Sequence, residues 1–270
     1  MKFSFFIEKE TKGSAICRGI QISEKIDNAS WYNHKEFNIE EFKNDVCIWV
    51  KCFPNGKFPK RSFIDIIDKR EALEFVKNNK NIGVIGSSIT SVKYIEEYIN
   101  RDVILIPHHH CNFDNEIIPF RSVSSVGFVG DKNHYMQIKD CIENELPEIG
   151  LEFKKLINPK DRLSVVEFLK SIDIQISFRD KKEWQELRNP LKLSNGGSFK
   201  IPTIAYPEPS YLKEYKDLFL IAETGMEIIS WCDKLKNNRE LYNKYAEGSF
   251  NKSKNYHIDK IIKIYHNLSK

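Results

Sequence analysis

A lysine, two small polar residues and a glutamate lie close together in the segment 188–208, which reads RNPLKLSNGGSFKIPTIAYPE. Lys192, Asn195 and Ser198 fall in or beside a predicted helix, and Glu208 follows the strand predicted after it. An ammonium group neutralises a diphosphate, whereas amide, hydroxyl and carboxylate groups hydrogen-bond the hydroxyls of ribose and of a sugar. These residue types at this spacing therefore suit a ligand that carries a diphosphate, a ribose and a sugar.

Two glycines, Gly196 and Gly197, interrupt the predicted helix of this segment. Each costs a helix about 1 kcal/mol relative to alanine, so the pair indicates that something approaches the helix closely. Either a ligand or a neighbouring strand would explain the two glycines. A helix–strand junction packed through glycine, without any ligand, is thus the alternative to a binding site.

Three adjacent histidines, His108, His109 and His110, stand after the apolar run 103–106 and before Cys111. Neighbouring residues of an extended chain point to opposite sides, and known zinc sites leave residues between their ligands, so we expect no metal here. One of the three, for which we select His109, would instead act as a general base or as a donor to an anion. The alternative is a polar loop in which one imidazole packs into the protein.

Two aspartates lie at the end of the apolar run 62–67, at positions 65 and 68. Asp65 could serve as a general base or bind a sugar hydroxyl, because ligands of parallel sheets lie at the carboxyl ends of the strands. Asp68 directly precedes the predicted helix 69–78. We expect Asp68 to cap that helix, and the role of Asp65 stays open between these alternatives.

Two further candidates follow apolar runs and involve glycine. The segment 11–19 follows the first run, and in it Gly13 would permit a tight turn while Arg18 and the next helix N-terminus would attract an anion. An ordinary loop between a strand and a helix is the alternative. Gly130 closes the run 125–129, where backbone could approach a ligand closely. Neither segment contains the glycine fingerprint of NAD-binding proteins.

Short apolar runs alternate with helix-like stretches along the whole chain. We expect strands at 3–7, 46–51, 62–67, 82–85, 103–106, 125–129, 151–156, 173–178 and 202–206, and helix from residue 211 onward. Continuously apolar strands separated by helices predict an α/β fold in which parallel sheets are covered on both faces. The polar stretch 112–121 is the expected boundary between two Rossmann-like halves, with a ligand crevice between them.

Composition narrows the class of protein. The apolar fraction of 41% and the charged fraction of 30% exclude a disordered chain, and the net charge of +4 is too weak to indicate nucleic-acid binding. This charge fits an anionic small molecule or a loose contact with an anionic membrane surface. The six cysteines form no CxxC pair, so we expect reduced thiols in the cytoplasm. No apolar run approaches the roughly 18 residues of a membrane span, and the opening residues are too short for a signal peptide.

At the segment 188–208 the chain resembles bacterial GT-B glycosyltransferases of the group 1 type. The pieces that carry the resemblance are 190–193, 195–198 and 201–205, together with 63–68, 102–109, 126–130 and the last helix at 257–268. They occur in the family's order over most of the chain. The resemblance implies two Rossmann-like domains facing each other across a cleft, an acceptor domain at 1–117 and a nucleotide-sugar domain at 118–250. It also implies a C-terminal helix at 251–270 that crosses back to the first domain.

The same resemblance implies a reaction and a role for each candidate residue. A sugar would pass from a nucleotide-diphosphate sugar to a hydroxyl of a glycan or lipid-linked acceptor, in bacterial surface polysaccharide or lipopolysaccharide synthesis, with no metal or other cofactor required. Lys192 would neutralise the diphosphate together with Arg179 or Arg188. Glu208 would bind a donor hydroxyl, and Gly130 would let the donor approach. His109 or Asp65 would be the base on the acceptor side.

Two departures from the family pattern accompany these expectations. Asn195 stands where the family usually has a glutamate that holds the ribose, although Asn195 and Ser198 could still contact ribose or phosphate. The chain is also short, so its acceptor domain must be trimmed. A sugar-nucleotide epimerase of the same fold and a non-catalytic nucleotide-sugar-binding subunit are the alternatives. We expect a cytoplasmic protein, with peripheral contact at the inner membrane as a further expectation, and no nucleic-acid partner.

Overall fold

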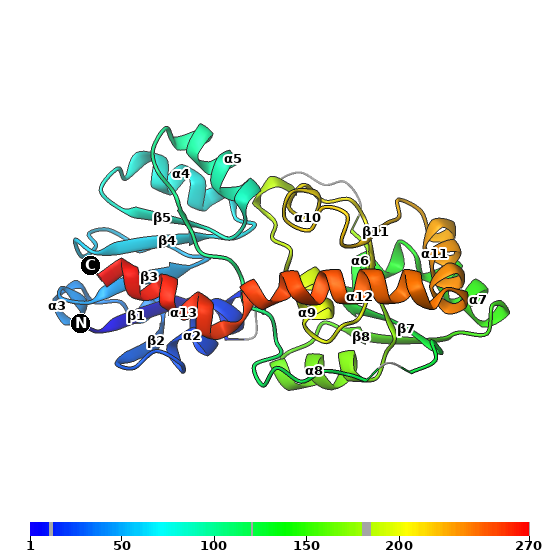
Figure 1. Cartoon of the computed structure of the whole chain (residues 1–270). Helices are drawn as coiled ribbons and strands as arrows, with labels where there is room; N and C mark the ends of the chain where they lie inside the picture. Colours follow the sequence, from blue (N-terminus) through cyan, green and yellow to red (C-terminus); the bar gives the residue numbers. More distant parts are fainter. Residues whose placement is uncertain (11–12, 120, 180–184, 270) are drawn as a thin grey trace. The chain divides into compact units, whose positions relative to one another are not determined.

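The computed structural model describes residues 1–10, 13–119, 121–179 and 185–269, which divide into two units (Figure 1). Unit 1 comprises Met1–His109, Glu183–Asn189 and Ile258–Lys270, and unit 2 comprises His110–Lys182 and Pro190–His257. Each unit is an α/β unit built on a parallel sheet, so the predicted fold class is confirmed. The chain leaves unit 1 after His109, ahead of the boundary expected at residue 117.

Six parallel strands form the sheet of unit 1, in the order β2-β1-β3-β4-β5-β6. The strands are β1 (Phe3–Ile7), β2 (Ala29–Asn33), β3 (Val46–Val50), β4 (Ser62–Ile66), β5 (Gly83–Gly86) and β6 (Ile104–Leu105). The longer helices are α4 (Arg70–Asn78), α5 (Ile89–Ile99) and α13 (Ile258–His266). Every residue of β1 and β3 is buried, which is the reason why both runs are apolar except at Ser4, whose hydroxyl donates to Oδ2 of Asp45 at 2.6 Å.

Aromatic side chains fill much of the core of unit 1. Phe6 of β1 stacks on Trp49 of β3, with ring centroids 5.0 Å apart. Tyr265 of the last helix, α13, packs edge-on against Phe5 with ring centroids 5.6 Å apart, and its ring is fully buried. The last helix is therefore an integral part of the core of unit 1.

The segment after β1 differs from the expected glycine loop, because helix begins at Gly13. Three short helices follow one another there, α1 (Gly13–Ala15), η1 (Ile16–Ile20) and α2 (Gln21–Ser23), and the middle one is a π turn. Residues 11–12 lie outside the described residues. Gly19 is the glycine that the packing needs, since a Cβ there would lie 2.5 Å from a methyl of Ile7, whereas nothing lies within 4 Å of that position on Gly13.

Five parallel strands form the sheet of unit 2, in the order β11-β10-β9-β7-β8. The strands are β7 (Ser125–Gly130), β8 (Glu152–Ile157), β9 (Ile174–Ser177), β10 (Thr203–Ala205) and β11 (Leu220–Ile221). The helices are α6 (Lys132–Met136), α7 (Lys139–Glu148), α8 (Arg162–Lys170), α9 (Leu191–Ser198), α10 (Pro209–Glu214), α11 (Gly225–Asn237) and α12 (Arg239–Ser253). Strand β11 corrects the expectation of helix throughout from residue 211, because it lies within the short apolar run 218–222 between polar residues.

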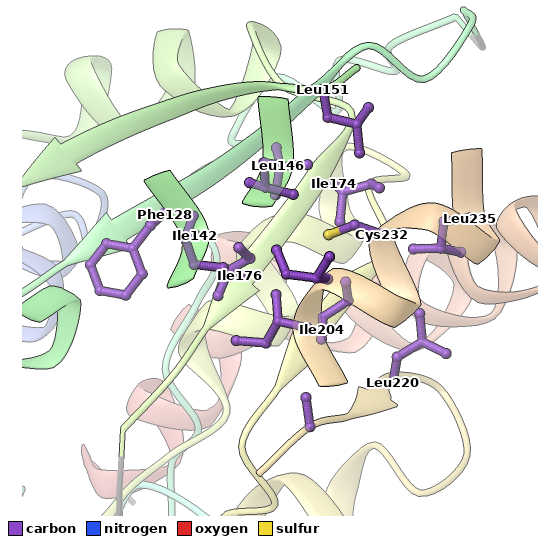
Figure 2. Packing of buried hydrophobic residues seen from close by; sticks show 14 of the residues in the cluster. Phe128, Ile142, Leu146, Leu151, Ile174, Ile176, Ile204, Leu220, Cys232 and Leu235 are labelled. Carbon is purple, nitrogen blue, oxygen red and sulfur yellow. The ribbon is translucent and has the colours of Figure 1, made fainter. Parts of the chain in front are cut away.

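The core of unit 2 lies between its sheet and the helices α7 and α11 (Figure 2). Ile174 and Ile176 of β9 and Ile204 of β10 point into it, and Ile142 and Cys232 approach them from the two helices. All five side chains are buried. This apolar layer fixes β9 and β10 side by side, and it thereby fixes the polar residues that follow them.

Two helix boundaries lie near the candidate residues. The predicted helix that carries Lys192 begins at Leu191, directly after Pro190, and the short 3-10 turn Gln185–Leu187 before it is separate, because a proline cannot continue a helix. Asp68 does not cap α4, since the N-cap of that helix is Lys69 and makes no side-chain cap hydrogen bond. Within the described residues, no helix is both long and apolar enough to cross a membrane.

Candidate functional site

Polar side chains gather at the carboxyl edge of the sheet of unit 2. Strands β7, β9 and β10 are parallel neighbours, so residues that follow them lie at the same edge. Arg179 follows β9, Glu208 follows β10, and Gly130 ends β7. This is the edge at which open parallel sheets bind their ligands.

Arg179 and Glu208 form a two-pronged ion pair at this edge. Nε of Arg179 donates to Oε1 of Glu208 and Nη2 donates to Oε2, both at 2.6 Å. The Glu208 side chain is fully buried, whereas 16% of the Arg179 side chain is exposed. The hydroxyl of Tyr211 accepts a further hydrogen bond from Nη2 at 3.4 Å. Glu208 therefore orients the guanidinium, and Arg179 is the member of the pair that reaches solvent.

Lys192 of α9 brings a second cation to the end of β7. A Cβ on Gly130 would lie only 2.8 Å from Nζ of Lys192, so the absence of a side chain at Gly130 makes room for the ammonium group. The same Nζ lies 5.2 Å from the centroid of the Phe128 ring, within reach of a cation–π interaction. Lys192 and Gly130, each selected separately in the sequence, thus lie together.

Asn195 and Ser198 are held by contacts inside unit 2. Oδ1 of Asn195 accepts a hydrogen bond from the backbone N–H of Cys111 at 2.9 Å, and the Ser198 hydroxyl donates to the carbonyl of Asn195 at 2.7 Å. Nδ2 of Asn112 donates to the Ser198 carbonyl at 2.9 Å. These bonds fasten the segment that begins unit 2 onto α9, and they engage both side chains that were expected to contact ribose or phosphate.

Gly196 and Gly197 allow the protein to pack closely around α9. A Cβ on Gly196 would lie 2.8 Å from Oγ1 of Thr203 in β10, and one on Gly197 would lie 2.7 Å from the carbonyl oxygen of Ser249 in α12. Strand and helix therefore fill both spaces. Of the two explanations open in the sequence, packing accounts for these glycines.

In unit 1, the expected base Asp65 is the partner of Arg18. Nε of Arg18 donates to Oδ2 of Asp65 at 2.5 Å, Nη2 donates to Oδ1 at 3.0 Å, and Nη1 donates to the carbonyl of Ile106 at 2.7 Å. Both side chains are buried, at 1% and 0% exposed. Burial raises the pKa of the Asp65 carboxyl, and the Arg18 guanidinium acts in the opposite direction. Asp65 and Arg18 therefore stabilise each other in the core, and neither is presented to a ligand.

The three histidines have three different surroundings. Nε2 of His109 lies 2.8 Å from the carbonyl oxygen of Cys17, which can only accept, so this nitrogen carries a hydrogen. His110 lies in unit 2, where its ring is 5.4 Å from that of His257. Burial lowers the pKa of His108 well below its usual range, and the charges of Arg18 and Lys51 act in the same direction. Within the described part of the chain, no group of three metal-ligating side chains occurs.

Arg188, the other expected diphosphate ligand, belongs to unit 1, where its backbone carbonyl accepts a hydrogen bond from the Ser88 hydroxyl at 2.8 Å.

Two polar residues escaped the sequence reasoning, Lys51 directly after β3 and Ser87 directly after β5. The sequence did contain a signal for both residues, because each follows an apolar strand, as Arg179 does. A lone lysine or serine in that position is too common to select without the fold.

No protein-family model and no curated protein sequence matches the chain. Among solved structures, it is similar to HepE from Anabaena in complex with UDP, at 12% identity and a TM-score of 0.68 over 100% of both chains. A TarM variant from S. aureus, in complex with fondaparinux, alpha-GlcNAc-glycerol and UDP, gives 12% identity and a TM-score of 0.64. That match covers 85% of this chain and 57% of TarM, so the chain spans little more than half of that protein.

The UDP-GlcNAc 2-epimerase from Neisseria meningitidis, bound to UDP-GlcNAc, is also similar, at 12% identity and a TM-score of 0.51 over 100% of this chain and 99% of the epimerase. At identities this low, the structural similarity establishes a shared fold and nothing more, and a shared fold by itself leaves the reaction open. The parallel sheets of both units agree with the same architecture. This chain therefore has the GT-B fold of glycosyltransferases, with two Rossmann-like units in one polypeptide.

Proposed function

We propose that this protein is a glycosyltransferase that moves a sugar from a nucleotide-diphosphate sugar to a hydroxyl acceptor. The observation that carries the proposal is the Lys192 ammonium group at the carboxyl edge of the sheet of unit 2, where Glu208 also orients the Arg179 guanidinium. An anionic ligand is what such an edge, with one lysine and an oriented guanidinium, suits best. HepE and TarM, which share the fold, have UDP in their structures, and this supports a nucleoside diphosphate as the ligand.

The donor side of the reaction follows from these residues. Lys192 neutralises the diphosphate, and Arg179, whose charge Glu208 balances, supplies guanidinium N–H donors in an orientation held by Glu208. When the bond from the sugar to the diphosphate breaks, negative charge grows on the leaving oxygen, and prearranged cations stabilise it. Glu208 thus acts through Arg179, a change from the donor-hydroxyl role first expected for it.

On the acceptor side we propose His109, whose Nε2 is held by the carbonyl oxygen of Cys17, as the base. Asp65 is not part of this proposal, because both of its carboxylate oxygens accept from Arg18. Asn195 and Ser198 stabilise α9 beneath the donor site and make no step of the reaction. We retain a glycan or lipid-linked acceptor of bacterial surface polysaccharide or lipopolysaccharide synthesis, at the inner membrane, as the acceptor class.

Calorimetric titration with UDP and UDP-sugars tests the donor site. Lys192→Ala removes one charged interaction worth about 1.5–3 kcal/mol, so we expect binding to weaken roughly 10- to 100-fold. Lys213→Ala is the matched control, because Lys213 is an exposed lysine of α10 in the same unit. Equal affinities of the wild type and Lys192→Ala would overturn the assignment of the donor site.

Epimerisation is the second candidate function, and the similarity to the epimerase supports it. The two reactions differ in their need for an acceptor. Incubation with a nucleotide-sugar alone yields an epimeric nucleotide-sugar in one case, whereas transfer releases the nucleoside diphosphate and depends on an added acceptor hydroxyl. Chromatography of the products with and without acceptor separates these outcomes.

A further inference from the structure

We infer that unit 1 binds an oxyanion, a carboxylate or phosphate group, with Lys51, His108 and Ser87 as its donors. This inference rests on the proposed function, since the oxyanion would belong to the acceptor, and it narrows the acceptors to negatively charged ones. Three observations carry it, each on one of the three residues. All three residues follow strands of the same parallel sheet, so they lie at its carboxyl edge.

The first observation concerns the imidazole of His108, which is 3% exposed. Neither of its ring nitrogens has a hydrogen-bond partner among the residues that the structure describes. A buried polar group without a partner costs about 1–3 kcal/mol, and native proteins retain few of them. Burial and the nearby Arg18, His109 and Lys51 lower the pKa of the ring, which stays neutral, with one N–H to donate.

The second observation concerns Lys51. Its φ of 57° is left-handed, a conformation that is uncommon for a residue with a side chain and that concentrates at functional sites. Its backbone N–H donates to the carbonyl of Asp65 at 3.1 Å, which fixes the turn beside the Arg18–Asp65 pair. Within the described ranges its half-buried ammonium group has neither a hydrogen bond nor an ion pair. Because Asp65 neutralises Arg18, Lys51 is the cation near His108 whose charge is left uncompensated.

The third observation concerns Ser87. Its side chain is fully buried, and its hydroxyl also lacks a partner among the described residues. The backbone N–H of Ile106 donates to the carbonyl of Gly86 at 3.0 Å, so the chain beyond β5 and the chain leading to His108 run side by side. Strand pairing therefore places Ser87 next to the segment that carries His108.

The chemistry of the ligand follows from the donors. An ammonium group, an imidazole N–H and a hydroxyl all donate hydrogen bonds, and Lys51 adds a full positive charge. A carboxylate or a phosphate accepts several such bonds at once, and charge-assisted bonds of this kind are the strong ones. A neutral sugar hydroxyl would leave the charge of Lys51 uncompensated. The structure thus favours a negatively charged acceptor over a neutral one.

The test observes His108 directly. We label the seven histidines with ¹⁵N, identify the ring signals of His108 by their loss in His108→Gln, and titrate the full chain with inorganic phosphate, glucuronate and glucose. We expect a saturable shift of the His108 signals with phosphate or glucuronate and none with glucose, and the stronger of the two anions identifies the group. Lys51→Gln should weaken this binding at least tenfold, whereas Lys57→Gln, an exposed lysine a few residues further on, should not change it.

Two results would overturn the inference: no saturable shift with either anion, or equal affinities in Lys51→Gln and Lys57→Gln. The test is independent of the donor site, because it needs neither a nucleotide nor turnover. The Lys192→Ala variant should show the same shift of the His108 signals as the wild type. If UDP does not bind but the His108 signals still shift with anions, only the proposed function is contradicted. If UDP binds but the His108 signals do not shift with anions, only the negatively charged acceptor class is contradicted.

Discussion

Because Arg18 and Asp65 form a buried ion pair, Asp65→Asn should lower the free energy of unfolding and not only the catalytic activity. In the folded protein the Arg18 guanidinium has three acceptors, the two oxygens of Asp65 at 2.5 and 3.0 Å and the carbonyl of Ile106 at 2.7 Å. Asparagine has nearly the same shape but no charge. The guanidinium, 1% exposed, would then keep its charge with no counterion and no access to water.

The size of the effect follows from these contacts. Two charge-assisted hydrogen bonds are worth about 1.5–3 kcal/mol each, and breaking a buried ion pair on one side typically costs about 3–5 kcal/mol. We therefore expect Asp65→Asn to lower the free energy of unfolding by about 3–5 kcal/mol. Replacing both partners by apolar residues, Arg18→Met with Asp65→Leu, should cost far less than the sum of the two single changes, since no buried charge is left.

Urea denaturation followed by circular dichroism and by tryptophan fluorescence provides the assay, because Trp49 lies in the core of unit 1 and reports on it. Asp68→Asn serves as control, since this exposed aspartate should change stability by less than about 0.5 kcal/mol. The reasoning is refuted if Asp65→Asn is as stable as Asp68→Asn while turnover is lost. That outcome would mean that the Asp65 carboxylate acts as a base, as the sequence first suggested.

Three further predictions concern stability. The pKa of His108 is lowered in the folded protein, so below the unfolded-state pKa of about 6.5 the unfolded chain binds one more proton than the folded chain. The free energy of unfolding should therefore fall by up to about 1.4 kcal/mol for each unit by which the pH is lowered. Urea midpoints measured between pH 7.5 and 5 should show this loss, and His108→Gln should make the midpoint less dependent on pH. Although burial acts to raise it, hydrogen bonds from Arg121, Ser124 and Ser125 lower the pKa of Asp173, so its contribution is present above about pH 4 and lost as pH falls below that value. Asp173→Asn should thus cost unit 2 about 2–3 kcal/mol at pH 7 and little near pH 2, and a pH-independent difference in melting temperature would contradict this. Gly197→Ala should destabilise by about 1–3 kcal/mol despite the better helix propensity of alanine, because the Ser249 carbonyl blocks the methyl group, whereas Gly13→Ala, with open space around it, should be neutral or stabilising in the same calorimetric measurement.

Much of the fold could be predicted because its signals are local. The strand expected at 3–7 is β1 (Phe3–Ile7), and the strands at 46–51 and 125–129 differ from β3 and β7 by one residue. Buried parallel strands are mostly apolar along their length, so they can be recognised in the sequence. The π turn after β1 could not be read in this way, because it has no periodicity of its own.

The candidate site was predictable to the extent that it depends on position along a strand. Lys192, Arg179, Glu208 and Gly130 were selected because they follow or flank apolar runs, and parallel strands bring such residues to one edge. What each side chain contacts there was beyond prediction. Glu208 looked like a ligand for sugar hydroxyls until its carboxylate was seen to hold Arg179.

The sequence by itself determined that this chain forms two α/β units, and it marked the carboxyl ends of the strands as the places for chemistry. Only the tertiary structure decided which polar groups neutralise one another and which are left to meet a ligand. Arg18 and Asp65 are 47 positions apart, and nothing local to either indicates that they pair. The physical reason is that burial makes the partner of a charge decisive, and the partner is supplied by whichever distant element the apolar core brings alongside.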